Sequence, residues 1–405
     1  MYKGKVAAII GGGPSGLLAA LTLAKEGVLT TLFERNPSVG AKLLLTGGGQ
    51  CNLTNQASVE ELLTRYGANG SFLKDAFHLL PPDKLMSLFS SMGLPLVVKE
   101  EGRVFPASHK AQDVVDTLYN ECRKAGVTFR LKTTIEKIKY QDPTFTLKFE
   151  GKEEHYDTLL IATGGASFPH TGSQGDGWRF AKDLGHKIVP VHPALSGVRL
   201  VDSTLTKCSG ITIEEAQLTF NKRQFRGPLL ITHRGLSGPL ILNTSRYFSG
   251  EEKIRVSFLP NPEGVGAELK KLISQKGGSQ LVTLVNQLGV PANLVSWLLE
   301  EGKIDGRRKA AEVGRKVIQR VVSLLTQLEL KVSLKGALKG AMVSGGGVAL
   351  EEVDTTTLQS KLVEGLFFAG EVLDIDGDSG GYNLQAAFST GYAAARGMVT
   401  FTLKQ

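Results

Sequence analysis

Three glycines near the start of the chain have the spacing of a turn that binds the pyrophosphate of a dinucleotide. They form Gly11-x-Gly13-x-x-Gly16, between the apolar run 6–10 and a second apolar segment, 17–20. In such a turn the first glycine permits a tight bend, the second lets phosphates approach the backbone, and the third allows helix and strand to pack closely. The free N–H groups and the positive end of the helix dipole favour the anion. The sequence therefore predicts a strand, a tight turn and a helix that open a nucleotide-binding domain.

A carboxylate follows at a suitable distance. Glu34 ends the apolar run 29–33 and lies 18 residues beyond Gly16, close to the spacing of the acidic residue that binds the ribose hydroxyls. The alternative is a glycine-rich turn that binds nothing. Because the turn is preceded by a strand, followed by a helix and closed by a strand that ends in Glu34, we expect an adenine dinucleotide.

Glycine is enriched elsewhere in the chain as well. There are 48 glycines in 405 residues, against an average usage of about 7%. The cluster 47–49 is followed by small polar residues that could lie against a planar ring of a ligand; the alternative is that this segment is a flexible surface loop. The cluster 163–165 follows a buried strand, and the pair 380–381 opens an Ala-rich helix. A second G-x-G-x-x-G is absent, because the nearest candidate, Gly264-x-Gly266, lacks the third glycine. One dinucleotide, held by both ends of the chain, is therefore expected.

The composition contains no metal or disulfide signature. Cys51, Cys122 and Cys208 are far apart and no C-x-x-C occurs, so neither a disulfide framework nor a zinc site is indicated, and no metal is expected. Cys51 is interpreted as a small buried thiol. No charged-then-apolar leader and no bilayer-length apolar segment are seen, which favours a cytoplasmic protein without a membrane partner. The net charge of +8 is compatible with nucleic acid or acidic metabolites and establishes neither.

The order of the predicted elements indicates a discontinuous nucleotide domain. The fold class expected is α/β, with a glutathione-reductase-like Rossmann domain over 1–190 and 336–405. A β-rich, barrel-like part is expected over 191–262, and a helical subdomain over 263–335. The segment 307–320 carries a basic face, which is either a solvated helix face or a nucleic-acid contact.

Three long motifs resemble a known family. They are residues 42–55 (KLLLTGGGQCNLTN), 232–239 (THRGLSGP) and 370–385 (GEVLDIDGDSGGYNLQ). In this order they resemble the BaiN-like FAD-dependent oxidoreductases, which include aminoacetone oxidase and proteins described as NAD(FAD)-utilising dehydrogenases. The resemblance covers essentially the whole chain. One departure is Gln50, where the family usually has Arg.

The resemblance implies a non-covalent FAD and a set of residues around it. The His that bonds covalently to flavin in the more distantly similar fumarate-reductase flavoproteins has no counterpart in 42–55. Glu34 would bind the adenosine ribose, Ile135 would reach the adenine, and the segment 381–383 would face the N1/C2=O edge of the flavin. The full set of implied cofactor contacts is Gly11, Gly13, Pro14, Ser15, Gly16, Glu34, Arg35, Lys42, Thr46, Gly47, Gly48, Gln50, Cys51, Asn52, Ile135, Thr163, Gly164, Gly165, Gly370, Glu371, Asp374, Gly381, Tyr382 and Asn383.

The function expected is hydride exchange between flavin N5 and a small organic substrate. NAD(P)H as a diffusible reductant and oxygen as a partner both stay open, as do the substrate and the oligomeric state. His233 and Arg234, or His170 and His192, are candidates for substrate binding or proton transfer, and a structural role is the alternative for each histidine. Two other hypotheses are an FAD-dependent RNA-modifying enzyme, suggested by the pI of 9.2, and a non-catalytic flavin-binding protein. A disulfide reductase is disfavoured, because the loop after Glu34 holds one cysteine where such enzymes place two.

Overall fold

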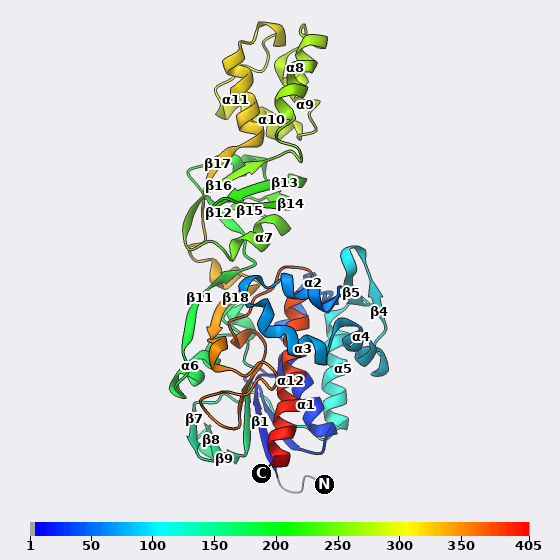
Figure 1. Ribbon diagram of the computed structural model, residues 1–405, viewed down its shortest axis with the longest axis vertical. Helices are drawn as coiled ribbons and strands as arrows, with labels where there is room; N and C mark the ends of the chain where they lie inside the picture. The colour runs from blue at the N-terminus through cyan, green and yellow to red at the C-terminus, as the bar shows by residue number, and fades with distance from the viewer. Residues whose placement is uncertain (1–4, 405) are drawn as a thin grey trace. The chain divides into compact units, whose positions relative to one another are not determined.

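Five parallel strands in the order β19-β10-β1-β2-β6 form the central sheet of the computed structural model, which describes residues 5–404 (Figure 1). The first strand, β1, lies in the middle, and its last residue, Ile10, pairs with Ile161 on one side and Phe33 on the other. The carboxyl ends of these strands therefore meet at one edge, where ligands bind in open parallel sheets. The strands are β1 (Val6–Ile10), β2 (Leu29–Phe33), β6 (Thr128–Arg130), β10 (Thr158–Ile161) and β19 (Leu366–Phe368).

The first and last helices lie side by side on this sheet, so the two ends of the chain complete one domain (Figure 1). Small residues allow the close contact: a Cβ on Gly391 of the last helix would lie 2.3 Å from the backbone oxygen of Ser15 in the first. The helices of this part are α1 (Pro14–Lys25), α2 (Val59–Thr64), α3 (Lys74–Leu79), α4 (Pro82–Ser91), α5 (Ala111–Lys124), α6 (Asp176–Asp183) and α12 (Tyr382–Lys404).

Smaller sheets surround the central one. Two are antiparallel, and one of them contains a hairpin that turns at Glu101-Gly102, between β4 and β5. The sheets are β3 (Thr54–Asn55), β5 (Arg103–Pro106) and β4 (Leu96–Val98); β7 (Lys137–Gln141), β8 (Thr144–Phe149) and β9 (Lys152–Tyr156); and the pair β11 (Ile188–Ala194) and β18 (Val343–Val348).

The chain divides into two compact units. The nucleotide unit runs up to His192 and resumes at Leu338, and the inserted unit is Pro193–Ala337. Each has its own apolar core. The boundaries expected from the sequence were 190 and 336. Within residues 5–404, no helix combines the length and the apolar character that crossing a bilayer requires.

A closed six-stranded barrel forms the β-rich part of the inserted unit. Its strand order is β12-β15-β14-β13-β16-β17, and four helices stand between β16 and β17 along the chain. The strands are β12 (Val198–Val201), β13 (Thr212–Phe220), β14 (Arg223–Ile231), β15 (Gly235–Ser237), β16 (Glu251–Ser257) and β17 (Leu328–Ser333); the helices are α7 (Pro239–Ser245), α8 (Val265–Lys276), α9 (Leu281–Asn286), α10 (Ala292–Glu301) and α11 (Arg315–Thr326). The α/β class with an inserted barrel and a helical part is thus confirmed.

The helical part is shorter than the 263–335 expected. The helix α11 ends at Thr326, and the next residues form β17, which pairs with both β16 and β12 and so closes the barrel. Leu328, Leu330 and Val332 are buried while the residues between them are exposed. This is the two-residue period of a strand, which was mistaken for the continuation of the preceding helical pattern.

Candidate cofactor-binding site

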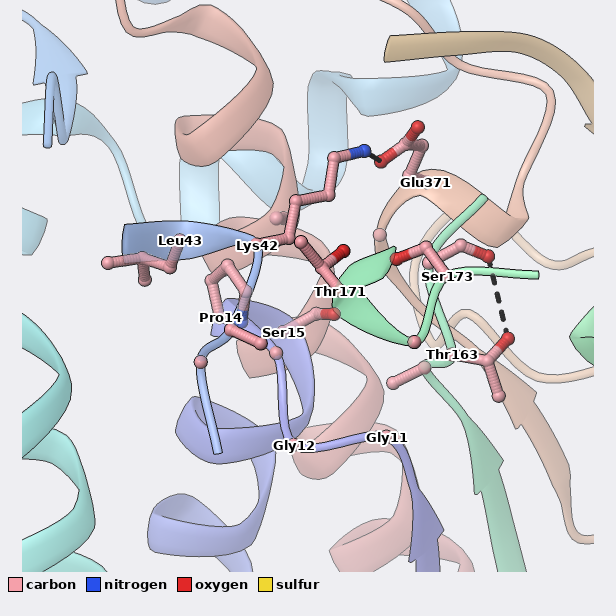
Figure 2. A pocket seen from close by; sticks show the side chains of 18 of the residues that line it. Gly11, Gly12, Pro14, Ser15, Lys42, Leu43, Thr163, Thr171, Ser173 and Glu371 are labelled. Carbon is pink, nitrogen blue, oxygen red and sulfur yellow. Dashed lines mark hydrogen bonds and ion pairs between the residues drawn. The ribbon is translucent and has the colours of Figure 1, made fainter. Parts of the chain in front are cut away.

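A pocket of about 1350 Å³, counted with the solvent at its mouth, opens beside the carboxyl edge of the central sheet (Figure 2). The sequence-predicted contacts that line it are Gly11, Gly13, Pro14, Ser15, Glu34, Arg35, Lys42, Thr46, Ile135, Thr163, Gly164, Gly370, Glu371 and Asn383.

The three motif glycines have different structural roles. A Cβ on Gly11 would lie 2.3 Å from the backbone oxygen of Ala162, and one on Gly16 would lie 1.9 Å from that of Gly11. These two positions are occupied by backbone, so a side chain would break the turn. A Cβ on Gly13 would meet nothing within 4 Å, and this residue lines the pocket. Gly13 therefore keeps space open where the first N–H groups of α1 have no partner within the helix.

Glu34 is fixed by backbone donors at the end of β2. Its Oε2 accepts a hydrogen bond from the Gly12 N–H at 2.8 Å, and its Oε1 accepts one from the Asn36 N–H at 2.9 Å. The residue is only 9% exposed and lines the pocket. Because an ionised carboxylate has about four acceptor positions, Glu34 keeps acceptor capacity for two hydroxyl groups.

A second loop closes the Glu34 end of the pocket. Arg35 Nη2 lies 2.9 Å from Asp176 Oδ2, and Asn36 Nδ2 donates to the Thr171 carbonyl at 2.9 Å. Asp176 is the first residue of α6, which Gly175 caps. Its carboxylate therefore pairs with Arg35 at the pocket wall and does not cap the helix.

An ion pair crosses the pocket between distant parts of the nucleotide unit. Lys42 Nζ lies 2.6 Å from Glu371 Oε2 (Figure 2) and 2.5 Å from Ser167 Oγ. Ser167 Oγ and the Ser344 N–H donate to the other carboxylate oxygen at 3.1 and 2.8 Å. Gly165 serves this network, since a Cβ there would lie 2.7 Å from Glu371 Oε1. Four separate segments are joined at one carboxylate.

The start of α12 contributes less to the pocket than expected. Asn383 lines it, and its Oδ1 accepts a hydrogen bond from the Gly377 N–H at 2.8 Å. Gly381 packs against a neighbouring segment, because a Cβ there would lie 2.4 Å from the Thr54 backbone oxygen. A bulky residue at 381 would strain the backbone before it reached any ligand.

Ten predicted contacts do not line the pocket in the part of the chain that the structure describes. They are Gly16, Gly47, Gly48, Gln50, Cys51, Asn52, Gly165, Asp374, Gly381 and Tyr382. Burial raises the pKa of the Cys51 thiol to about 12, so Cys51 is a protonated, packed side chain, as interpreted from the sequence. Burial also raises the pKa values of Asp374 and Tyr382. Gln50 accepts a hydrogen bond from Lys99 Nζ at 3.2 Å, which places a cation beside the residue that stands where the family usually has Arg.

The histidine candidates do not gather in one place. His233 and Arg234 are exposed on the turn between β14 and β15 of the inserted unit. In the nucleotide unit, His170 is exposed beside Phe168, and the ring of His192 packs on Gly345 of β18. None of these four residues lines the pocket within residues 5–404.

Sequence reasoning missed several lining residues. Thr133 and Thr134 follow β6, and their signal is the neighbouring strand order, since β6 ends beside β2. Thr171 and Ser173 come from a loop with no local motif, and Met342 and Val343 from the start of β18. Met342 is 47% exposed although it is a large apolar residue.

The chain matches the HI0933-like protein Rossmann domain over residues 5–397. The chain belongs to this family. A ribosomal RNA dihydrouridine synthase of Haemophilus influenzae is 31% identical over 394 residues, 96% of each chain. A 3-dehydro-bile acid delta(4,6)-reductase of Clostridium scindens is 30% identical over 403 residues, 96% of this chain and 97% of the relative.

Solved structures show the same fold at lower identity. A 3-ketosteroid-delta4-(5alpha)-dehydrogenase from Rhodococcus jostii has a TM-score of 0.52 at 14% identity and covers 99% of this chain and 98% of its own. A 3-ketosteroid delta1-dehydrogenase from Sterolibacterium denitrificans has a TM-score of 0.53 at 12% identity, with 98% and 99% covered. The HI0933-like family is one of FAD-dependent oxidoreductases, which confirms the flavoprotein interpretation of the motifs.

Proposed function

We propose that this HI0933-like protein is an FAD-dependent reductase of carbon–carbon double bonds conjugated with a carbonyl group. The observation that carries the proposal is the open cradle at Gly13 beside the fixed carboxylate of Glu34. A dinucleotide needs both features, one for its pyrophosphate and one for its ribose. The cradle lies in a pocket formed by both ends of the chain, as expected for a single large cofactor.

The residues present fit FAD. The α1 N-terminus at Gly13 and Ser15 would bind the pyrophosphate, Glu34 the adenosine ribose, and Ile135 and Thr133 the adenine side. Lys42, held by Glu371, would balance the phosphate charge. The apolar side chains Val343, Ile375 and Leu384 would form the wall for the isoalloxazine. When bound, the flavin supplies hydride chemistry, while the protein supplies orientation and electrostatics.

The reaction class is supported by what the two full-length relatives have in common. Forming dihydrouridine saturates the double bond of a uracil ring next to a carbonyl. A 3-dehydro-delta(4,6) substrate likewise carries double bonds conjugated with a ketone. We propose that hydride adds to the β carbon of an enone, or to the δ carbon of a dienone, that a proton adds to the neighbouring carbon, and that NAD(P)H supplies the two electrons.

A turnover assay tests the proposal. Purified holoprotein is incubated anaerobically with NADH or NADPH and either a 3-oxo-4,6-diene steroid or a uracil-containing RNA. We expect nicotinamide oxidation that depends on one of these acceptors and a product heavier by two hydrogens. NAD(P)H that is oxidised only after air is admitted, with neither acceptor reduced, would overturn the assignment.

A specific observation favours uracil in RNA as the acceptor. The net positive charge of the chain lies in the inserted unit, which carries +9 while the nucleotide unit is close to neutral, and a small neutral enone gives no reason for such a distribution.

A further inference from the structure

Charge is distributed very unevenly between the two units. The inserted unit, Pro193–Ala337, contains 21 Lys and Arg against 12 Asp and Glu, a net charge of +9, while the whole chain carries +8. The nucleotide unit is therefore close to neutral, with 26 Lys and Arg against 27 Asp and Glu. The excess positive charge belongs to the part of the chain that does not form the cofactor pocket.

Within the inserted unit, three cations of the barrel strands pair with carboxylates, whereas a group of exposed cations in the helical part forms no ion pair among the described residues. Lys253 and Arg255 lie within ion-pair distance of Glu329, and Lys331 lies 2.7 Å from Glu251. In the helical part, seven exposed cations surround the loop before α11 and the first turns of α11; we call them the basic cluster. They are Lys276, Arg307, Arg308, Lys309, Arg315, Lys316 and Arg320. Across the part of the chain that the structure describes, none of them forms an ion pair with a carboxylate.

Backbone hydrogen bonds hold the cluster together. The Ala311 N–H donates to the Gly277 carbonyl at 2.9 Å, and the Ala310 N–H donates to that of Ser279 at 2.9 Å. These bonds attach the loop 307–312 to the end of α8, next to Lys276. Ala310 and Val313 are buried in the apolar core below. The loop is therefore a fixed surface that presents its cations outward.

The positions of these cations are unfavourable for the protein alone. The first turn of α11 contains Arg315 and Lys316 and no acidic residue, so two cations face the positive end of the helix dipole. Lys316 and Arg320 are four residues apart, where like charges repel. Asp305 and Glu312 are the only acidic residues in 303–320. Because these charges oppose both the helix dipole and the spacing preferred on a helix, their presence on an exposed surface indicates a function for that surface.

We infer that the basic cluster of α8 and α11 is a docking surface for RNA. The inference rests on the proposed function, in which uracil within RNA is the acceptor. Four of the seven cations are Arg, whose planar guanidinium group pairs with two phosphate oxygens at once. Closely spaced cations that form no ion pair with a carboxylate among the described residues suit the regular phosphates of a polynucleotide, which bind by releasing counterions.

The test compares two charge-matched quadruple variants of the full-length holoprotein. The cluster variant is Arg307→Gln/Arg315→Gln/Lys316→Gln/Arg320→Gln. The control variant is Lys74→Gln/Lys84→Gln/Lys152→Gln/Lys182→Gln, which changes four exposed lysines of the nucleotide unit. Binding is measured by fluorescence anisotropy with a labelled uracil-containing RNA hairpin over a range of salt concentrations. Vesicles of phosphatidylglycerol serve as a second anionic probe.

We expect the cluster variant to bind the hairpin at least about tenfold more weakly at low salt. Its slope of log K against log salt should be shallower by up to about 3, because each lost phosphate contact removes about 0.7–0.9. The control variant should stay within about twofold of the wild type. If the cluster variant is poorly folded, Lys316→Gln/Arg320→Gln should give a smaller loss of the same kind.

Other outcomes would overturn the inference. Equal RNA affinity in the cluster and control variants would do so, and so would a loss confined to vesicle binding, which would indicate a membrane surface. FAD content and NAD(P)H-dependent reduction of the steroid acceptor separate this inference from the proposed function. If the wild type reduces neither acceptor but the cluster variant still loses RNA binding, the proposed reaction is refuted while the docking surface is supported.

Discussion

The ammonium group of Lys42 lies 2.6 Å from the carboxylate of Glu371, 329 positions later in the chain. Both side chains are about four-fifths buried, and Glu371 also accepts hydrogen bonds from Ser167 and Ser344. The pair joins the loop after β2 to the segment after β19 at the wall of the cofactor pocket. It is therefore a link between the two halves of a discontinuous domain.

Replacing Lys42 should weaken FAD binding more than it weakens the fold. Lys42→Met leaves the Glu371 carboxylate unpaired beside the expected phosphates, which should cost about 1–3 kcal/mol, or roughly five- to 150-fold in FAD affinity. Titration of the apoprotein with FAD, followed by flavin fluorescence, measures this. Lys42→Arg and the double variant Lys42→Met/Glu371→Gln should each recover part of the affinity. Unchanged affinity in Lys42→Met would show that the pair is only structural.

Two glycines of the same motif should respond in opposite ways to alanine. At Gly13 the φ angle is −81° and a Cβ meets open space, so Gly13→Ala should change the unfolding free energy of the apoprotein by less than about 0.5 kcal/mol. It should nevertheless weaken FAD binding at least about tenfold, because the methyl group occupies the phosphate cradle. Gly16→Ala should destabilise the apoprotein itself by about 1–3 kcal/mol through overpacking. Urea unfolding with and without FAD distinguishes the two, and equal FAD affinity in wild type and Gly13→Ala would argue against the cradle.

Stability should fall at mildly acidic pH because of His186. This residue is 3% exposed, and its Nε2 lies 2.8 Å from Ser360 Oγ; burial lowers its pKa. The unfolded chain therefore binds a proton more readily than the folded one. The contribution of neutral His186 is complete above about pH 6.5 and is lost as pH falls below it, by at most about 1.4 kcal/mol per pH unit.

Urea unfolding at pH 7.5 and 5.5 measures this dependence. His186→Gln should be less stable at pH 7.5 but lose less between the two pH values than the wild type. His170→Gln, at an exposed histidine, is the control and should change neither value. An identical loss in His186→Gln and wild type would assign the pH dependence to other groups.

Met342 should affect the acceptor more than the cofactor. It lines the pocket near the start of β18 and is 47% exposed, a position where a large apolar side chain suits a substrate held against the flavin. Met342→Gln should raise the KM for the acceptor several-fold while FAD content and thermal stability stay near the wild type. A loss of FAD with an unchanged KM for the acceptor would show that Met342 contacts the cofactor and not the acceptor.

The sequence predicts best what is decided locally. The strand, turn and helix around Gly11 and the carboxylate of Glu34 follow from side-chain size, periodicity and spacing, and they are found as expected. Loop residues of the pocket such as Thr171 and Ser173 could not be predicted, because the contacts that bring their loop to β2 come from Arg35 and Asn36, which are more than 130 positions away in sequence.

The wrong predictions also arise from contacts between residues that are distant in sequence. The strand β17 pairs with strands more than 70 and 120 residues away in sequence, so its neighbours could not be read from its own residues. Gly381 and Gly165 carry the signature of backbone near a ligand, yet protein atoms occupy the space beside them. A glycine in the sequence indicates that other atoms lie close to the backbone, but it does not show whether those atoms belong to a ligand or to the protein.

The most direct test of the central claim is a single anaerobic turnover of the reduced holoprotein. The bound flavin is photoreduced without nicotinamide, mixed with one equivalent of a 3-oxo-4,6-diene steroid or a uracil-containing RNA, and followed by its absorbance. The account predicts that one of these acceptors reoxidises the flavin and that one equivalent of the acceptor gains two hydrogens, while Gly13→Ala apoprotein gives no product. Flavin that stays reduced with both acceptors and is reoxidised only by air would contradict the account.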